Sequence, residues 1–182
     1  MLAGNEAFIP NNFESIATVT VGSGGSSTVT FSSIPSTYTH LQVRLLARSG
    51  RARTANGNLY MQLNSSYLTS YHLLFGNGAS TTAQGSGGGL TNGEAILLVP
   101  GSTAGANIFG VGVIDILDYA NTNKTKVIRA LNGDDLNGEG YAVLTSGMLN
   151  STSAVTSITF GSGDGSGSIP QYSHFALYGV KA

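Results

Sequence analysis

Hydrophobic and polar residues alternate in short runs along this chain, most clearly over residues 40–48. In a β-strand successive side chains point to opposite faces, so a period of two assigns each residue to one face. Leu46 is the one residue in the run that breaks the alternation. The run predicts a strand with an apolar face of Leu41, Val43, Leu45 and Ala47 and a polar face of Gln42, Arg44 and Arg48.

Similar β-branched or alternating runs, bounded by Gly, Ser, Asn and Pro clusters, recur along the rest of the chain. Residues 69–75 fit a strand or a single helical turn equally well. We expect 27–32 to return against 13–21 as a hairpin across the turn at 22–26. The predicted strands are 13–21, 27–32, 40–48, 59–64, 94–99, 108–117, 124–131, 141–149, 154–160 and 172–180.

No segment shows a 3.6-residue period over the length of a helix, so helical crossovers between parallel strands are not expected. About ten or eleven short strands with frequent turns instead predict an all-β fold, an antiparallel β-sandwich of jelly-roll type. Residues 49–57, 76–93 and 132–140 read as loops. A length of 182 residues fits one domain, which we place at 13–182 after an N-terminal arm at 1–12.

The chain carries unusually little charge. Asp, Glu, Lys and Arg make up 9% of it, against about 25% in a typical soluble domain. Glycine, serine, threonine and asparagine occupy the polar positions instead. A neutral surface of this kind suits a protein pressed against copies of itself or against a neighbour, which favours a structural or binding role over an enzyme.

Charge and targeting signals narrow the partners. The formal net charge is −1, so no global field attracts nucleic acid or an anionic membrane, and neither is an expected partner. There is no cysteine for a disulfide or a thiolate metal site. The first ten residues lack the basic and apolar regions of a signal peptide, so we expect the protein to be made in a cytoplasm.

The few charged residues form clusters. In so neutral a chain, these clusters are the expected contacts that set register between subunits or with a larger shell. Arg44 and Arg48 share a predicted strand face and would reach one partner together. The clustered residues are Arg44, Arg48, Arg51, Arg53, Lys124, Lys126, Arg129, Asp134, Asp135 and Glu139.

Catalytic and metal-binding chemistry finds little support. The three histidines lack metal-ligand spacing, and residues three apart on a strand, such as Asp115 and Asp118, point to opposite faces and do not make an acid/base pair. Asp118 is expected to order the turn at 121–123 and to pair with Lys124 or Lys126. We predict no enzyme activity and no cofactor.

Two further groups leave alternatives open. The loop at 132–140 holds three acids and two side-chain amides, which would suit calcium, but it does not match the EF-hand pattern and is better explained as a solvated turn. The tyrosines would suit either a sugar-stacking platform or subunit interfaces.

Four segments together resemble small virion proteins of tailed bacteriophages, especially aquatic phages. The likeness keeps its order over nearly the whole chain. It is specific for a phage structural module but less so for its place in the virion. The segments are FESIATV at 13–19, IPSTYTHLQVR at 34–44, IDILDYANTNK at 114–124 and FALYGVK at 175–181.

This resemblance implies a virion protein without a catalytic motif. We expect a capsid decoration (cement) protein that binds the major capsid protein at the shell surface, commonly as a homotrimer. Phe8 and Ile9 of the arm would lie along the shell. The alternative is a tail fibre or baseplate module that recognises host surface glycan through tyrosines and residues 76–93. The chain lacks the long shaft or coiled coil that a self-standing fibre usually needs, which favours decoration.

Overall fold

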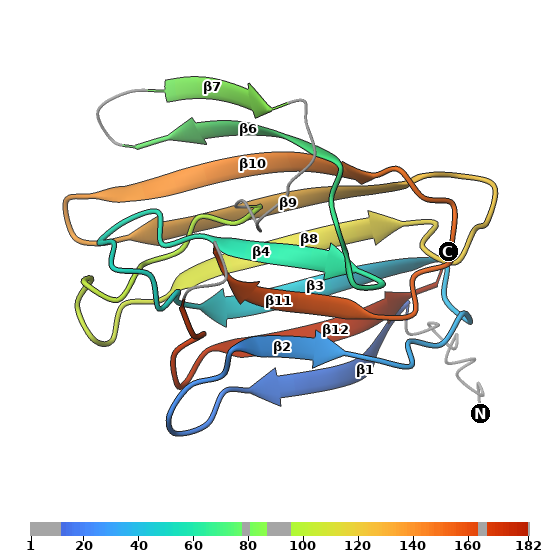
Figure 1. Ribbon diagram of the computed structural model, residues 1–182, viewed down its shortest axis with the longest axis horizontal. Coiled ribbons are helices and arrows are strands. Elements are labelled where there is room, and N and C mark those ends of the chain that lie inside the picture. Colours follow the sequence, from blue (N-terminus) through green and yellow to red (C-terminus); the bar gives the residue numbers. More distant parts are fainter. Residues whose placement is uncertain (1–11, 78–80, 87–95, 164–166, 182) are drawn as a thin grey trace, which may run out of the picture.

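The computed structural model describes residues 12–77, 81–86 (backbone only), 96–163 and 167–181. Within these residues the chain forms twelve β-strands (Figure 1). The strands are β1 (Phe13–Thr20), β2 (Thr28–Phe31), β3 (His40–Ala47), β4 (Leu59–Leu63), β5 (Ser66–Tyr67), β6 (Ser70–Gly76), β7 (Thr81–Ser86), β8 (Gly110–Leu117), β9 (Lys126–Asp135), β10 (Gly140–Leu149), β11 (Ile158–Ser162) and β12 (His174–Val180).

The strands form two stacked antiparallel sheets (Figure 1). The larger sheet has eight strands in the order β1-β12-β3-β8-β9-β10-β6-β7, and the smaller has four in the order β2-β11-β4-β5. Strands β1 to β4 alternate between the two sheets, as in a jelly roll. The predicted all-β sandwich is confirmed, and β9, β10, β6 and β7 extend one of its sheets.

The core lies between the sheets and follows the period-two pattern. Alternate residues of β3 are buried, and they pack in one cluster with buried residues of the smaller sheet. The rings of Phe160 on β11 and Phe175 on β12 lie 5.2 Å apart and join the layers. Each fully buried large apolar side chain contributes about 1.5–3 kcal/mol to stability.

Two strand expectations are wrong. The first strand does not form a hairpin with the second: β1 pairs with β12, and β2 pairs with β11 in the other sheet. The chain crosses between layers after β1, where Ser26 bridges Ile169 instead. Residues 94–99 do not form a regular strand in their described part, since their one ladder contact is the bridge between Leu97 and Leu59.

Two of the three expected loops are shorter than the sequence suggests, while residues 49–57 lie in the connection between β3 and β4 as expected. Within 76–93, residues 81–86 form β7 and pair with β6, which settles 69–75 as a strand. Residues 78–80 and 87–93 lie outside the described part. In the 132–140 region β9 continues to Asp135 and β10 starts at Gly140, so the turn is limited to 136–139.

Candidate functional site: the outer face of the large sheet

The outer face is the side of the eight-stranded sheet that points away from the four-stranded sheet. Alternate residues of β8, β9 and β10 are exposed there, and many of them are large and apolar. Leu131 is the most exposed, at 62%. The exposed apolar residues of this face are Phe13, Leu46, Leu74, Val111, Val113, Leu117, Val127, Leu131 and Leu144.

Strand register aligns several of these residues into a continuous row. Val113 lies opposite Leu131, Leu131 opposite Leu144, and Leu144 opposite Leu74, so the row crosses four strands. Directly opposed side chains on one sheet face are close enough to touch. Monomeric proteins rarely expose contiguous apolar patches larger than a few hundred Å², and larger patches usually mark binding sites. The row therefore makes the outer face a candidate binding surface.

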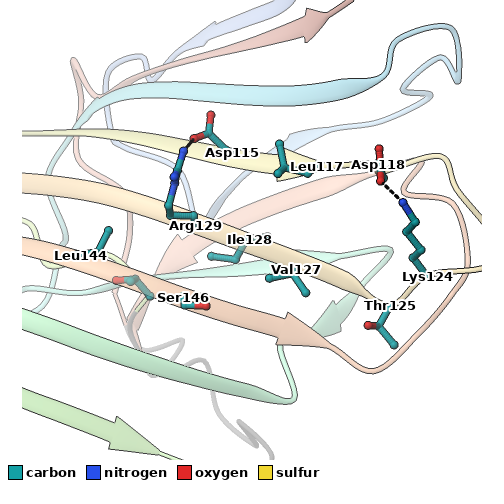
Figure 2. Close-up of a pocket in the computed structure, with 11 residues that line it drawn as sticks. Asp115, Leu117, Asp118, Lys124, Thr125, Val127, Ile128, Arg129, Leu144 and Ser146 are labelled. Atoms are coloured by element: carbon teal, nitrogen blue, oxygen red, sulfur yellow. Dashed lines mark hydrogen bonds and ion pairs between the residues drawn. The ribbon is translucent and has the colours of Figure 1, made fainter. Parts of the chain in front are cut away.

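A polar row runs beside the apolar one. Gln42 Nε2 donates to Asp115 Oδ1 at 2.9 Å, and Arg129 Nη2 donates to Asp115 Oδ2 at 2.9 Å. Figure 2 shows Arg129 reaching across from β9 to Asp115 on β8. Burial raises the pKa of Asp115, but these two hydrogen bonds and the Arg129 charge outweigh it, so the pKa lies below its ordinary value. The carboxylate is therefore held charged within a neutral pair.

The polar row borders an open pocket of about 380 Å³ between β8, β9 and β10 (Figure 2). At its far end Lys124 Nζ donates to Asp118 Oδ2 at 2.5 Å, as the sequence predicts. Asp118 adopts a positive φ of 50° and its carbonyl accepts from Asn121 N–H, so it also orders the turn. Leu117 and Val127 line the pocket between the two ion pairs.

Arg44 continues the polar network toward the edge of the sheet. Its Nε donates to Gln42 Oε1 at 2.8 Å, and its guanidinium lies 5.5 Å from the Phe13 ring centroid and 4.9 Å from that of Tyr178. Hydrogen bonds thus link Arg44, Gln42, Asp115 and Arg129 across β3, β8 and β9. The predicted placement of Arg44 on an exposed strand face is confirmed.

Arg48 does not lie beside Arg44, contrary to expectation. Strand β3 ends at Ala47, and the chain turns inward there, leaving Arg48 6% exposed. Its guanidinium donates to four backbone carbonyls of one loop, and burial lowers its pKa. The acceptors are Gly101, Ala104, Gly105 and Ala106. Arg48 therefore holds a loop of its own subunit and is not available for a joint contact.

Lys126 is likewise internal. It shares the inward face of β9 with Ile128 and Ala130 and is fully buried. Its ammonium donates to the carbonyls of Asn121, Lys124 and Thr152, and burial lowers its pKa. The interface expectation is wrong for Lys126 in this conformation. The alternation of inward residues from 126 to 130 is the signal that would have placed it inside.

The acidic cluster occupies the end of the β9–β10 hairpin. Asp134 Oδ1 accepts from Tyr141 N–H at 2.8 Å, while its buried Oδ2 has no partner, and burial raises its pKa. Asp135 Oδ1 accepts from Asn137 N–H at 2.8 Å, and Glu139 is exposed. Their pairing with cations of another subunit stays a prediction.

The remaining expected residues are dispersed. Arg51 and Arg53 lie in the connection between β3 and β4, where Arg51 O accepts from Ser102. Phe8 and Ile9 lie outside the described residues. Across the described ranges, no three histidines or carboxylates come together as a metal site would require.

The tyrosines do not gather into one exposed platform within the described part. Tyr60 and Tyr119 are buried, Tyr178 lies under Arg44, and Tyr172 is exposed in the connection before β12. The sequence did not predict the outer apolar row. This row forms only when particular strands pair, and the pattern within one strand does not give its partners.

The comparisons with known proteins give no relative. No family model matches the chain, and neither a curated protein nor a solved structure shows a significant match. None of the described segments forms a helix with the length and hydropathy to cross a membrane.

Proposed function

We propose that this chain is a structural protein of a tailed-bacteriophage virion, and most specifically a decoration protein that binds the capsid surface as an oligomer and stabilises the shell. The observation that carries the proposal is the apolar outer face of the large sheet. On the outer face of β8 and β9, Asp115 and Arg129 pair with each other, Val113 lies opposite Leu131, and Val111 lies opposite Gly133. A protein that covers this face removes apolar surface from water, and this stabilises the complex.

The resemblance to phage virion proteins and the jelly-roll strand order support the same proposal. Viral coat proteins are among the proteins that use the double-sheet jelly roll, although this fold serves many functions. The scarcity of charge agrees with a protein covered by neighbours. The tail-module alternative relies on tyrosines and on residues 76–93, and two of those tyrosines, Tyr60 and Tyr119, are core residues.

Reconstitution on particles tests this function. Phage particles lacking the protein would be mixed with the purified chain, and bound copies would be counted against the major capsid protein. We expect saturable binding and a higher temperature of genome release. Failure to bind the shell, together with binding of the purified chain to host glycan, would replace decoration by the tail alternative.

A truncated variant tests the arm separately. Removing residues 1–12 takes away Phe8 and Ile9 while leaving the strands in place. We expect weaker shell binding with little change in the unfolding transition, because among the described residues the truncation removes the hydrogen bond from Lys181 N–H to Asn12 O. Normal binding by the truncated protein would remove the arm from the account and leave the decoration role standing.

A further inference from the structure

We propose that the outer face packs against the same face of a second copy of this chain, about a twofold axis that runs parallel to the strands between β8 and β9. This inference goes beyond the virion role and does not depend on it. It also differs from the homotrimer that the family resemblance implies, because a twofold contact pairs subunits.

The size of the face fits a stable pair. Eight strands about 4.8 Å apart, each about eight residues long at 3.3 Å per residue, make a face of roughly 1,000 Å². A standard protein interface buries about 800 Å² on each partner. The face therefore offers the area that one specific partner needs.

The charge on the face is self-complementary. Residues Val111 to Leu117 of β8 lie opposite residues of β9. In this pair of segments the charged side chains on the outer face are Asp115 and Arg129. They lie opposite one another on neighbouring strands and are already paired. Within these rows a second copy therefore meets no net charge, and its own pair can align with this one. Arg44, exposed opposite Val113 on β3, is a further cation on the same face.

Strand register then selects the axis. A twofold axis that runs parallel to the strands between β8 and β9 places β8 of one copy over β9 of the other. Each row of paired residues keeps its position along the strands. This axis places Asp115 over Arg129 of the second copy and Val113 over Leu131 of the second copy. An axis perpendicular to the strands through the polar row would instead place Asp115 over its own counterpart, and opposed like charges are unfavourable.

The packing geometry agrees with known sheet pairs. Two sheets that pack face to face keep their strands within about 30° of each other and lie about 10 Å apart. Residues nearest the axis therefore stay in register despite the twist. Leu117 and Val127 would face each other's counterparts and close the pocket that lies beside the polar row.

Sedimentation of the purified chain tests the association. We expect a reversible dimer whose population rises with concentration. Leu131→Glu, at a position 62% exposed, should give a folded monomer. Thr30→Glu is the matched control, because it adds the same charge on the exposed side of β2 in the smaller sheet and should remain dimeric. A monomer at all concentrations, a trimer, or equal effects of both variants would overturn the proposal.

Cysteine crosslinking tests the axis, since the chain contains no cysteine. Val113→Cys and Leu131→Cys proteins would be prepared separately and treated with a bismaleimide that spans the ~10 Å between packed sheets. Crosslinks between these two variants should form readily, whereas crosslinks between Val113→Cys and Leu117→Cys proteins should be at least several-fold fewer, because these positions are four residues, or about 13 Å, apart along the strand. A preference for crosslinks between Val113→Cys and Leu117→Cys would show the axis perpendicular to the strands and overturn the proposed one.

Discussion

Two buried cations stabilise the subunit from inside. The charged groups of Arg48 and Lys126 each donate hydrogen bonds to several backbone carbonyls, which take the place of water. Neither group forms an ion pair with a carboxylate among the described residues. Arg44 and Lys124 are their exposed counterparts nearby in the sequence. A single charge cluster in the sequence thus divides into internal supports and surface groups.

Lys126→Met should lower the free energy of unfolding by about 2–4 kcal/mol, because it leaves buried carbonyls without a donor. Lys124→Met removes an exposed ion pair and should cost no more than about 1 kcal/mol. Urea unfolding of both variants measures the difference. Equal costs would mean that the carbonyl contacts of Lys126 contribute little.

Arg48→Ala should destabilise the isolated subunit by about 3 kcal/mol or more, since four carbonyls lose a donor. Arg44→Ala removes ring contacts at the surface and should cost about 1 kcal/mol or less. Thermal unfolding compares the two. The account of Arg48 as an internal support would be contradicted by a variant as stable as Arg44→Ala.

At the scale of elements, alternation predicts most strands but not their partners. The alternation over 40–48 predicts β3 and its buried face correctly, because successive residues of a strand point to opposite faces of the sheet. Its neighbours β12 and β8 are distant in sequence, and pairing across such distances depends on the packing of whole layers. The outer apolar row could not be predicted for the same reason.

The β8–β9 pair should make stability depend on acid pH through Asp115. Its folded pKa lies below its ordinary value of 3.8, so the carboxylate stabilises the fold above that value. This stability is lost as pH falls through the lower folded pKa. Asp115→Asn should therefore be less stable than the wild type at neutral pH, and urea titrations at about pH 3 should show a smaller gap.

The β9–β10 hairpin should show the opposite sign through Asp134. Burial raises its folded pKa, so the ionised carboxylate destabilises the fold at neutral pH, and protonation relieves this as pH falls. Asp134→Asn should raise the unfolding temperature at neutral pH, by less as the pH falls. Asp135→Asn is the control, because its exposed oxygen keeps the bond from Asn137 N–H. A lower unfolding temperature for Asp134→Asn would refute the burial argument.

At the scale of the whole molecule, one sheet is much wider than the other. The smaller sheet and the segment at 96–99 cover the core side of the eight-stranded sheet, and the opposite side of that sheet carries the aligned apolar rows. The all-β class could be predicted from the alternation of apolar and polar residues. The low charge follows directly from the composition. The surface itself emerges only when β8, β9, β10 and β6 lie side by side, as Figure 1 shows.

Cryo-electron microscopy of whole particles that carry this protein tests the central claim most directly. We predict copies that follow capsid symmetry, with the outer face at Val113 and Leu131 covered by protein. Copies that follow tail symmetry, or a capsid-bound copy whose outer face is open to solvent, would contradict it.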